Sequence, residues 1–296
     1  MPSLLERIGT GDILVGDGAM GTMLFERGLR PGECPERWNL ERPEVLKEIA
    51  RLYLDAGANI ISTNTFGGSP LKLQPYDFDA RTEAINAAAV RAVRKVVADR
   101  AYVSASCGPC GLLIQPLGDV STDEVYESFL RQLRAVAAEG VDLICIETMT
   151  DLTEAKLAVK AAREAAPDSP IAATMTFDDT PNGFFTVMGV SVAQAAQELV
   201  EAGADIIGSN CGNGIENMIR IAAEFKRHTS LPLLIQSNAG LPLLSGDVVT
   251  YPETPEFMAD KSRELVKLGV NIIGGCCGTT PEHIRAFKKV VGERRT

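Results

Sequence analysis

The sequence predicts an α/β fold, a single (β/α)8 barrel that extends over residues 1–296. Eight apolar, β-branched runs end in small or polar residues, and an amphipathic helical stretch follows each of them. The runs are apolar on both faces, which is typical of parallel strands that are buried on both sides. Units of this kind recur at intervals of roughly 30 to 45 residues, as a closed barrel requires. A doubly wound open sheet is the alternative, but it seldom needs eight such units in so short a chain.

The eight predicted strands share an apolar beginning and a small or polar end. In chain order they are DILVGDGAMGT from Asp12, ANIISTNTF from Ala58, AYVSASCGPCG from Ala101, VDLICIETM from Val141, PIAATMTFD from Pro170, ADIIGSNCG from Ala204, PLLIQSNAG from Pro232 and VNIIGGCCG from Val270.

The predicted helices are bounded by ordinary start and stop signals, such as Gly57 after the first and Pro167 after the fourth. They cover about 43–56, 80–97, 121–140, 154–166, 192–202, 215–228, 255–268 and 281–291. The longest stretches without a pattern are 67–79, 177–190 and 241–255. All three follow strand ends, where the active-site loops of a barrel grow.

The composition excludes several classes of partner. A net charge of −10 and a pI near 4.9 oppose binding to a nucleic-acid backbone. No apolar run approaches the roughly 20 residues that span a bilayer. The start, MPSLLERIGTGD, lacks the long apolar segment of a secretory signal, so a cytoplasmic, reducing location is expected. In that location the seven cysteines favour core, metal-ligand or catalytic roles over disulfides.

The carboxyl ends of barrel strands carry the chemistry of this fold. In this sequence those ends hold several polar or thiol side chains. They are Asp17, Asn64 and Thr65, Cys107 with Cys110, Glu147, Asp178, Cys211, Asn238, and Cys276 with Cys277.

Three cysteines are expected to meet on one rim. Cys211 follows the sixth strand and Cys276-Cys277 follow the eighth, and a barrel brings these ends within about 10 Å of each other. Three thiolates suit Zn²⁺ and leave a fourth tetrahedral position for a substrate or water. Adjacent cysteines reach one ion only where the backbone turns, and Gly274, Gly275 and Gly278 allow such a turn.

The remaining cysteines have simpler interpretations. The pair in CCG could itself be two buried thiols that fill space, but the similar SNCG strand end favours a metal. Cys107 and Cys110 have redox spacing without a thioredoxin-like unit, so they are interpreted as incidental residues of a rim loop. Cys145 is expected in the core and Cys34 on the surface or in a loop, and neither histidine is given a catalytic role.

Two acidic residues suggest an amino-acid substrate. Asp17 lies in DGAMGT, whose backbone N–H groups can hold a carboxylate, and Asp17 and Glu147 together could hold an ammonium group. With a thiophilic metal, such a site fits an α-amino acid that carries a thiol. The alternatives are a turn-forming aspartate and a capping or ion-paired glutamate.

The motifs as a set resemble the homocysteine S-methyltransferase family over about residues 12–286. Two of them, NAGLP and CCGTTPEHI, look closest to the homocysteine-binding domain of cobalamin-dependent methionine synthase, and less like betaine– or S-methylmethionine–homocysteine methyltransferases. The motifs are DGAMGT (17–22), NTF (64–66), ET (147–148), GSNCG (208–212), NAGLP (238–242) and GGCCGTTPEHI (274–284).

The resemblance implies a role for each matching residue. Cys211, Cys276 and Cys277 match the zinc ligands, and Asn238 matches a position that approaches the zinc when substrate is absent. The amino-acid site is matched by residues Asp17, Gly18, Ala19, Met20 and Glu147, with Thr65 as a weaker candidate. SCGPCG departs from the family pattern and leaves a second metal or a redox role open.

The resemblance also implies an activity, in which homocysteine is activated as a zinc thiolate and methylated to methionine. The expected donor is methylcobalamin on a partner corrinoid protein or domain, which this chain would not bind as its own cofactor. S-methylmethionine or betaine as a small donor, another substrate thiol, and a non-catalytic zinc-binding barrel are the alternatives. The sequence fits a stand-alone enzyme and a fragment equally.

Overall fold

Eight parallel strands form the centre of the molecule, which a computed structural model describes over residues 1–245 and 248–293. Their order in the sheet is β1-β12-β9-β8-β5-β4-β3-β2. The two outer strands meet through a parallel bridge between Gly16 and Ile60, and the Asn59 N–H donates to the Val15 carbonyl at 2.7 Å. These contacts close the sheet, so the predicted (β/α)8 barrel is confirmed. The strands are β1 Leu14–Val15, β2 Ile60–Ser62, β3 Tyr102–Cys107, β4 Leu143–Met149, β5 Ile171–Met175, β8 Ile206–Asn210, β9 Leu233–Ser237 and β12 Ile272–Gly275.

The amino-terminal end of the barrel is filled with apolar side chains. Every one of the eight strands contributes to this layer, and helix α1 (Leu4–Gly9) adds Leu4 and Ile8. The strand members are Leu14, Ile60, Tyr102, Leu143, Cys145, Ala172, Ile206, Leu234 and Ile272. Because this end is packed solid, the polar strand ends at the opposite, carboxyl end are where a ligand can enter.

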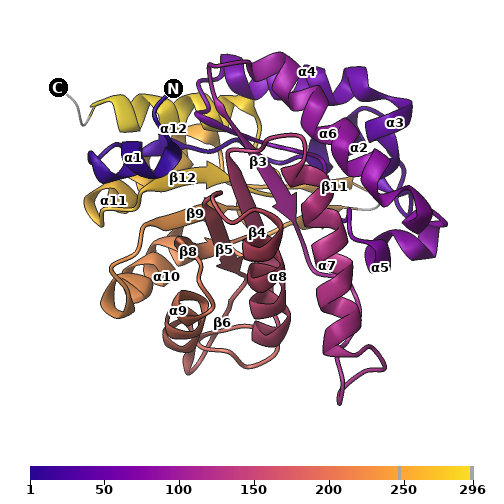
Figure 1. The fold of residues 1–296 in the computed structure, drawn as a ribbon. Helices are drawn as coiled ribbons and strands as arrows, with labels where there is room; N and C mark the ends of the chain where they lie inside the picture. Colours follow the sequence, from indigo (N-terminus) through magenta and orange to yellow (C-terminus); the bar gives the residue numbers. More distant parts are fainter. Residues whose placement is uncertain (246–247, 294–296) are drawn as a thin grey trace.

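The helices surround the strands, as Figure 1 shows, and a second apolar core fills the space between the two layers. The eight predicted helices are all present. For example, α7 begins with a capping box in which Ser121 and Glu124 bond to each other's backbone N–H groups. None of the described helices is both long enough and apolar enough to cross a membrane. The helices are α4 Pro43–Asp55, α6 Thr82–Val97, α7 Thr122–Ala137, α8 Leu152–Ala165, α9 Val192–Glu201, α10 Ile215–His228, α11 Pro255–Lys267 and α12 Pro281–Glu293.

The stretches expected to be irregular contain short elements. Residues 67–79 hold helix α5 (Pro70–Leu73) and a 3-10 turn, and residues 177–190 hold a hairpin of β6 (Asp178–Thr180) and β7 (Gly183–Phe185). Strands β10 (Leu243–Ser245) and β11 (Val248–Thr250) pair within 241–255, of which residues 246–247 lie outside the described part. Pro-Asn-Gly at 181–183 is a turn signal that predicts the first hairpin.

Shorter helices were not predicted at all. They are α1, α2 (Gly21–Glu26) and α3 (Trp38–Glu41), and their few residues carry too little periodicity to be recognised. Helix α1 does begin with a capping box of Ser3 and Glu6, which was available as a signal.

Candidate active site

A cavity of about 270 Å³ opens at the carboxyl end of the barrel. Wider grooves on the outer helices are more open and contain no thiol cluster. Most of the predicted site residues meet in the cavity, while Thr65 and Asn238 are not part of its wall. Its lining includes Asp17, Gly18, Ala19, Met20, Ser62, Thr63, Ser106, Glu147, Thr148, Cys211, Gln236, Cys276 and Cys277.

Three thiols converge on one side of this cavity. The sulfur atoms of Cys211, Cys276 and Cys277 all lie within 4.8 Å of one another, and the Cys211–Cys277 distance is 3.9 Å. Each is partly buried. Among the described residues they are the group of cysteine, histidine and acidic side chains that lies close enough together to hold a metal ion.

The backbone at the strand ends aims these thiols. Cys211 directly follows β8 and adopts a left-handed conformation with φ of 61°, which is uncommon for a residue with a side chain. The Cys211 N–H donates to the Gln236 carbonyl, and the Cys276 N–H donates to the Ser237 carbonyl. After β12 the left-handed turn comes from Gly278, whereas Gly274 and Gly275 still belong to the strand. The turn that was expected from all three glycines therefore rests on one of them.

The thiol cluster fits a tetrahedral zinc ion. Zinc–sulfur bonds of about 2.3 Å at tetrahedral angles place two sulfur atoms about 3.8 Å apart, close to the observed 3.9 Å for Cys211 and Cys277. The Asn238 Oδ1 atom is buried and has no hydrogen-bond partner among the described residues. Such an unsatisfied acceptor beside thiols is consistent with a cation site.

The three thiols cannot easily ionise together without a cation. Hydrogen bonds from Cys276 and Cys277 lower the pKa of Cys211 to about 3. The same hydrogen bonds and burial raise the pKa of Cys276 well above its usual value and that of Cys277 to about 11. The protein alone thus favours one thiolate shared by the cluster, and a cation is what would make three thiolates stable.

Two carboxyl groups, Asp17 and Glu147, line the same cavity as the thiols. Asp17 accepts hydrogen bonds from Ser62, at 2.7 Å from its N–H and 2.9 Å from its hydroxyl. Burial nevertheless raises the pKa of Asp17 to about 6. Glu147, which accepts from the Ser106 hydroxyl and is partly accessible from the cavity, has its pKa raised to about 7, mainly by burial. A bound cationic group would relieve both carboxylates.

Asn210, at the end of β8, connects the carboxylate to the thiols. Its Nδ2 atom lies 3.4 Å from a Glu147 oxygen and 4.0 Å from the Cys276 sulfur. Its Oδ1 atom accepts from the Thr148 N–H and the Thr174 hydroxyl, each at 2.7 Å. Thr148 itself has a positive φ of 60°, at a register shift in β4, so this network holds an unusual turn of the strand next to Glu147.

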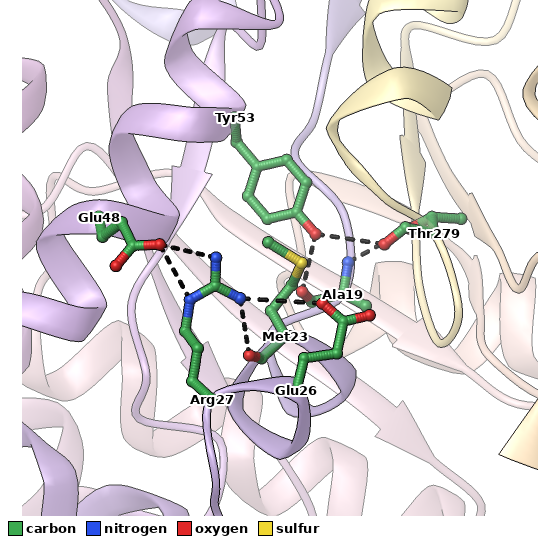
Figure 2. Close-up of polar contacts among 7 residues, drawn as sticks. All are labelled: Ala19, Met23, Glu26, Arg27, Glu48, Tyr53 and Thr279. Atoms are coloured by element: carbon green, nitrogen blue, oxygen red, sulfur yellow. Dashed lines mark hydrogen bonds and ion pairs between the residues drawn. The ribbon is translucent and has the colours of Figure 1, made fainter. Parts of the chain in front are cut away.

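The loop after β1 is fastened to the loop after β12. Figure 2 shows that the Tyr53 hydroxyl lies between the carbonyls of Ala19 and Thr279, at 2.8 and 3.3 Å. The Ala19 N–H donates to the Thr279 hydroxyl at 3.2 Å. This N–H is therefore used inside the protein, which leaves those of Gly18 and Met20 as the candidates for binding a substrate carboxylate.

The same view shows the polar contacts of Arg27, the residue that follows α2. Arg27 donates to Glu48 of α4 at 2.8 and 3.1 Å and to the Met23 carbonyl at 2.9 Å, with Glu26 at 3.8 Å. These contacts tie α2 to the outer helix layer.

Replacing Tyr53 with phenylalanine is expected to loosen the loop of residues 17–20. The change removes the buried hydroxyl and leaves the ring, so we expect a loss of about 1–2 kcal/mol in the free energy of unfolding. Urea denaturation measures this loss. Replacing the exposed Tyr76 with phenylalanine is the matched control, and an equal change in both variants would contradict the role of the Tyr53 hydroxyl.

Several predicted rim residues point elsewhere. The Thr65 hydroxyl is buried and donates to the Ser106 carbonyl at 2.6 Å, while Thr63 faces the cavity instead. Asn64 lines the cavity, but its side-chain amide bonds to Asn39 and the Pro35 carbonyl. Asp178 is exposed in β6.

Of the two cysteines expected in a rim loop, Cys110 lies in the loop after β3, whereas Cys107 still belongs to the strand. Cys107 is the last residue of β3, and both thiols are buried in the core between strands and helices. Since side chains alternate along a strand, Ser106 faces the cavity and Cys107 must face outward. Burial raises the pKa of Cys110 to about 12 and that of Cys107 well above its usual value, which opposes thiol reactivity at neutral pH.

Sequence reasoning missed the polar side chains inside the strands. Ser62, Ser106, Asn210 and Gln236 all contact the carboxylates or line the cavity. Each is a polar residue within an otherwise apolar run, which is the signal that could have found it. The Gln236 Oε1 atom is buried and has no hydrogen-bond partner among the described residues, so it could accept a hydrogen bond from a ligand.

Convergent thiols, two buried carboxyl groups and unsatisfied acceptors at the carboxyl end of a (β/α)8 barrel define the site of a barrel enzyme. Residues 14–291 match the family model for homocysteine S-methyltransferase, so the chain belongs to this family of methyltransferases.

The relatives agree with this membership. The chain is 32% identical to the methionine synthases of Mycobacterium tuberculosis and Mycobacterium leprae, over 94% of its own length and 24% of theirs. It therefore spans about a quarter of these relatives. Among solved structures, the metallated form of the homocysteine methyltransferase MmuM from Escherichia coli is 25% identical with a TM-score of 0.77, covering 94% of this chain and 96% of that one. The apo form, at 24% identity, a TM-score of 0.73 and 98% coverage of both chains, shows the same fold.

Proposed function

We propose that the chain is a zinc-dependent methyltransferase that converts homocysteine to methionine, with residues 1–296 forming one homocysteine-binding domain. The observation that carries the proposal is the geometry of Cys211, Cys276 and Cys277, whose sulfur atoms lie within 4.8 Å of one another at the cavity wall. These three residues would hold the zinc ion, and Asn238, whose side chain neighbours the Cys211 thiol and has an unpartnered oxygen, would approach it.

The carboxyl groups in the cavity suit the amino-acid part of homocysteine. Asp17 and Glu147 would hold its ammonium group, because a cation compensates two carboxylates whose pKa values burial has raised. The Gln236 Oε1 atom would accept a further hydrogen bond from it. The N–H groups of Gly18 and Met20 would bind the substrate carboxylate.

The reaction needs the substrate sulfur as a thiolate. An alkyl thiol with a pKa near 8.5 is mostly protonated at pH 7. Zinc, when bound, supplies a Lewis acid that keeps this sulfur deprotonated and still nucleophilic. The chain's own contribution is orientation, since the carboxylates would fix the amino acid and so direct its sulfur toward the three cysteines. The sulfur would then attack a methyl group in line, and the electron pair of the broken bond would leave with the demethylated donor.

The donor is proposed to be methylcobalamin on a corrinoid protein or domain. This rests on the 32% identity to methionine synthases of which the chain spans 24%. The corrinoid would be a partner's cofactor. S-methylmethionine and betaine are the competing donors, and the assay below separates them.

The first test is metal analysis of the purified chain, followed by assays with homocysteine and one donor at a time. We expect about one zinc per chain and methionine formed with methylcobalamin. If methionine forms only with S-methylmethionine or betaine, that small molecule is the donor, and the proposed zinc site still holds. A reduced protein that binds no zinc would contradict the proposal.

A further inference from the structure

A short segment between β11 and α11, residues 251–253, contacts both loops that carry the thiols and the loop after β9 that carries Asn238. Nothing in its sequence, Tyr-Pro-Glu, marks it as functional. We infer that Tyr251 and Glu253 form a brace that positions Cys211 and Cys277 for the metal, an inference that rests on the zinc site proposed above. Both would be positioning residues, since they act through the ligands and not on the substrate.

Tyr251 covers the loop after β12. Its ring lies so close to Gly278 that a Cβ atom there would be 2.1 Å from the Tyr251 Cγ atom. Its hydroxyl lies close enough to the Cys277 thiol that each group perturbs the pKa of the other. A side chain at 278 would displace the ring, so the glycine and the tyrosine belong to one packing arrangement. The hydroxyl then limits the directions in which the Cys277 sulfur can point.

Glu253 fastens the loop after β8. Its carboxylate accepts from the Ile215 N–H at 3.0 Å, at the first residue of α10 and four residues after Cys211. A Cβ atom on Gly214 would be 2.0 Å from a Glu253 oxygen, so the carboxylate lies directly against the connecting turn. This contact fixes where the turn from Cys211 to α10 runs.

The backbone of Glu253 joins the other two loops. Its N–H donates to the Ala239 carbonyl at 2.9 Å, in the loop after β9, next to Asn238. Its carbonyl accepts from the His283 Nε2 atom at 3.0 Å, and the His283 Nδ1 atom accepts from the Thr280 N–H at 3.1 Å. The two bonds require one neutral tautomer of His283 and tie the brace to the start of α12.

The brace makes two kinds of contact, through its backbone and through its side chains. Backbone bonds of Glu253 hold the brace itself, and they survive any side-chain change. The Tyr251 hydroxyl and the Glu253 carboxylate are the groups that reach the ligand loops. Partners of metal ligands typically change metal affinity by 10–100-fold when they are removed, and the same range is expected here.

The test compares zinc affinity, by competition with a chelator, and the absorption spectrum of the Co²⁺-substituted protein. Tyr251→Phe and Glu253→Ala are expected to weaken zinc binding about 10–100-fold and to shift the Co²⁺–thiolate bands. Glu253→Gln should restore most of the affinity, since its side-chain oxygen still accepts from Ile215. Tyr126→Phe, on the outer surface of α7, is the matched control and should change neither quantity.

The outcomes separate this inference from the proposed function. Zinc binding and Co²⁺ spectra like those of the unaltered protein in both Tyr251→Phe and Glu253→Ala would overturn the brace and keep the zinc site. Failure of the unaltered, reduced protein to bind zinc would overturn both. We expect weaker zinc binding and an altered Co²⁺ spectrum in Tyr251→Phe and Glu253→Ala. We expect unchanged zinc binding in Tyr126→Phe.

Discussion

Replacing Cys211 with alanine is expected to abolish zinc binding and methyl transfer while the barrel stays folded. The change removes one of three proposed ligands, and a zinc site of two thiolates loses most of its affinity. We expect methionine formation to fall on the order of 10³-fold or more, since the substrate thiol would again be mostly protonated. Metal analysis and the methylcobalamin assay measure the two losses.

Folding should be affected little, because the thiols lie on loops outside both apolar cores. A barrel of this size does not need a metal to fold, so circular dichroism should show the same helix content with and without a chelator. Cys110→Ala, a buried thiol away from the cavity, is the matched control and should keep its zinc. Global unfolding on chelation would instead support a structural zinc site and contradict a catalytic one.

The barrel itself could be predicted from the sequence because its signals are repeated. Strands such as β8 and β12 are apolar runs that end at a polar residue or a glycine, and helices such as α4 and α8 are followed closely by glycine or proline. The hairpins β6–β7 and β10–β11 have no repeat to support them, and α1 is only six residues long. Short elements of this kind depend on tertiary contacts, as Leu4 and Ile8 show by packing into the barrel interior.

The thiol cluster was predictable for a similar reason, since the carboxyl ends of parallel strands must meet at one end of a barrel. What could not be predicted was the direction of each side chain. Ser106 and Cys107 are neighbours in sequence, but the pleat turns one into the cavity and the other into the outer core. Likewise, the contact of Tyr251 with Gly278 depends on how a distant loop folds back over the site.

Replacing Glu147 with glutamine is expected to raise KM for homocysteine without loss of zinc. The variant keeps the shape of the side chain and removes the charge that would hold the substrate ammonium. Losing one partner of a buried charge pair costs about 2–5 kcal/mol, or roughly 30-fold or more in binding. Glu154→Gln, which alters a buried carboxyl group of α8 that accepts from the Cys110 N–H, is the matched control. An unchanged KM in Glu147→Gln would remove Glu147 from the substrate site.

The pH profile should change in the same variant. In the free protein the pKa of Glu147 is about 7 and that of Asp17 about 6. As the pH falls through 7, Glu147 becomes neutral and loses its attraction for the ammonium group, so kcat/KM should fall on the acid side. In Glu147→Gln this acid limb should move to lower pH, where only Asp17 titrates. If the acid limb of the kcat/KM profile stays near pH 7 in Glu147→Gln, a group other than Glu147 causes it.

Without zinc and substrate, the Glu147→Gln variant should also be more stable to unfolding than the natural protein at high pH. A carboxyl group whose pKa rises from 4.5 to about 7 on folding binds its proton more tightly in the folded state. Stability is therefore lost as the pH rises from 4.5 to 7, by about 3 kcal/mol if the group were fully buried. Glu147 is partly accessible from the cavity, and glutamine would lose the 3.4 Å bond from Asn210.

A net gain of about 1–2 kcal/mol is therefore expected for zinc-free Glu147→Gln at pH 8. No gain is expected at about pH 3.5 or below, where the natural carboxyl group is protonated in both states. Urea unfolding at the two pH values measures the difference. A variant that is less stable at pH 8 would mean that the free protein already compensates the charge. The expected gain would instead mean that the ionised, buried Glu147 lowers the free energy of unfolding until a cationic substrate binds beside it.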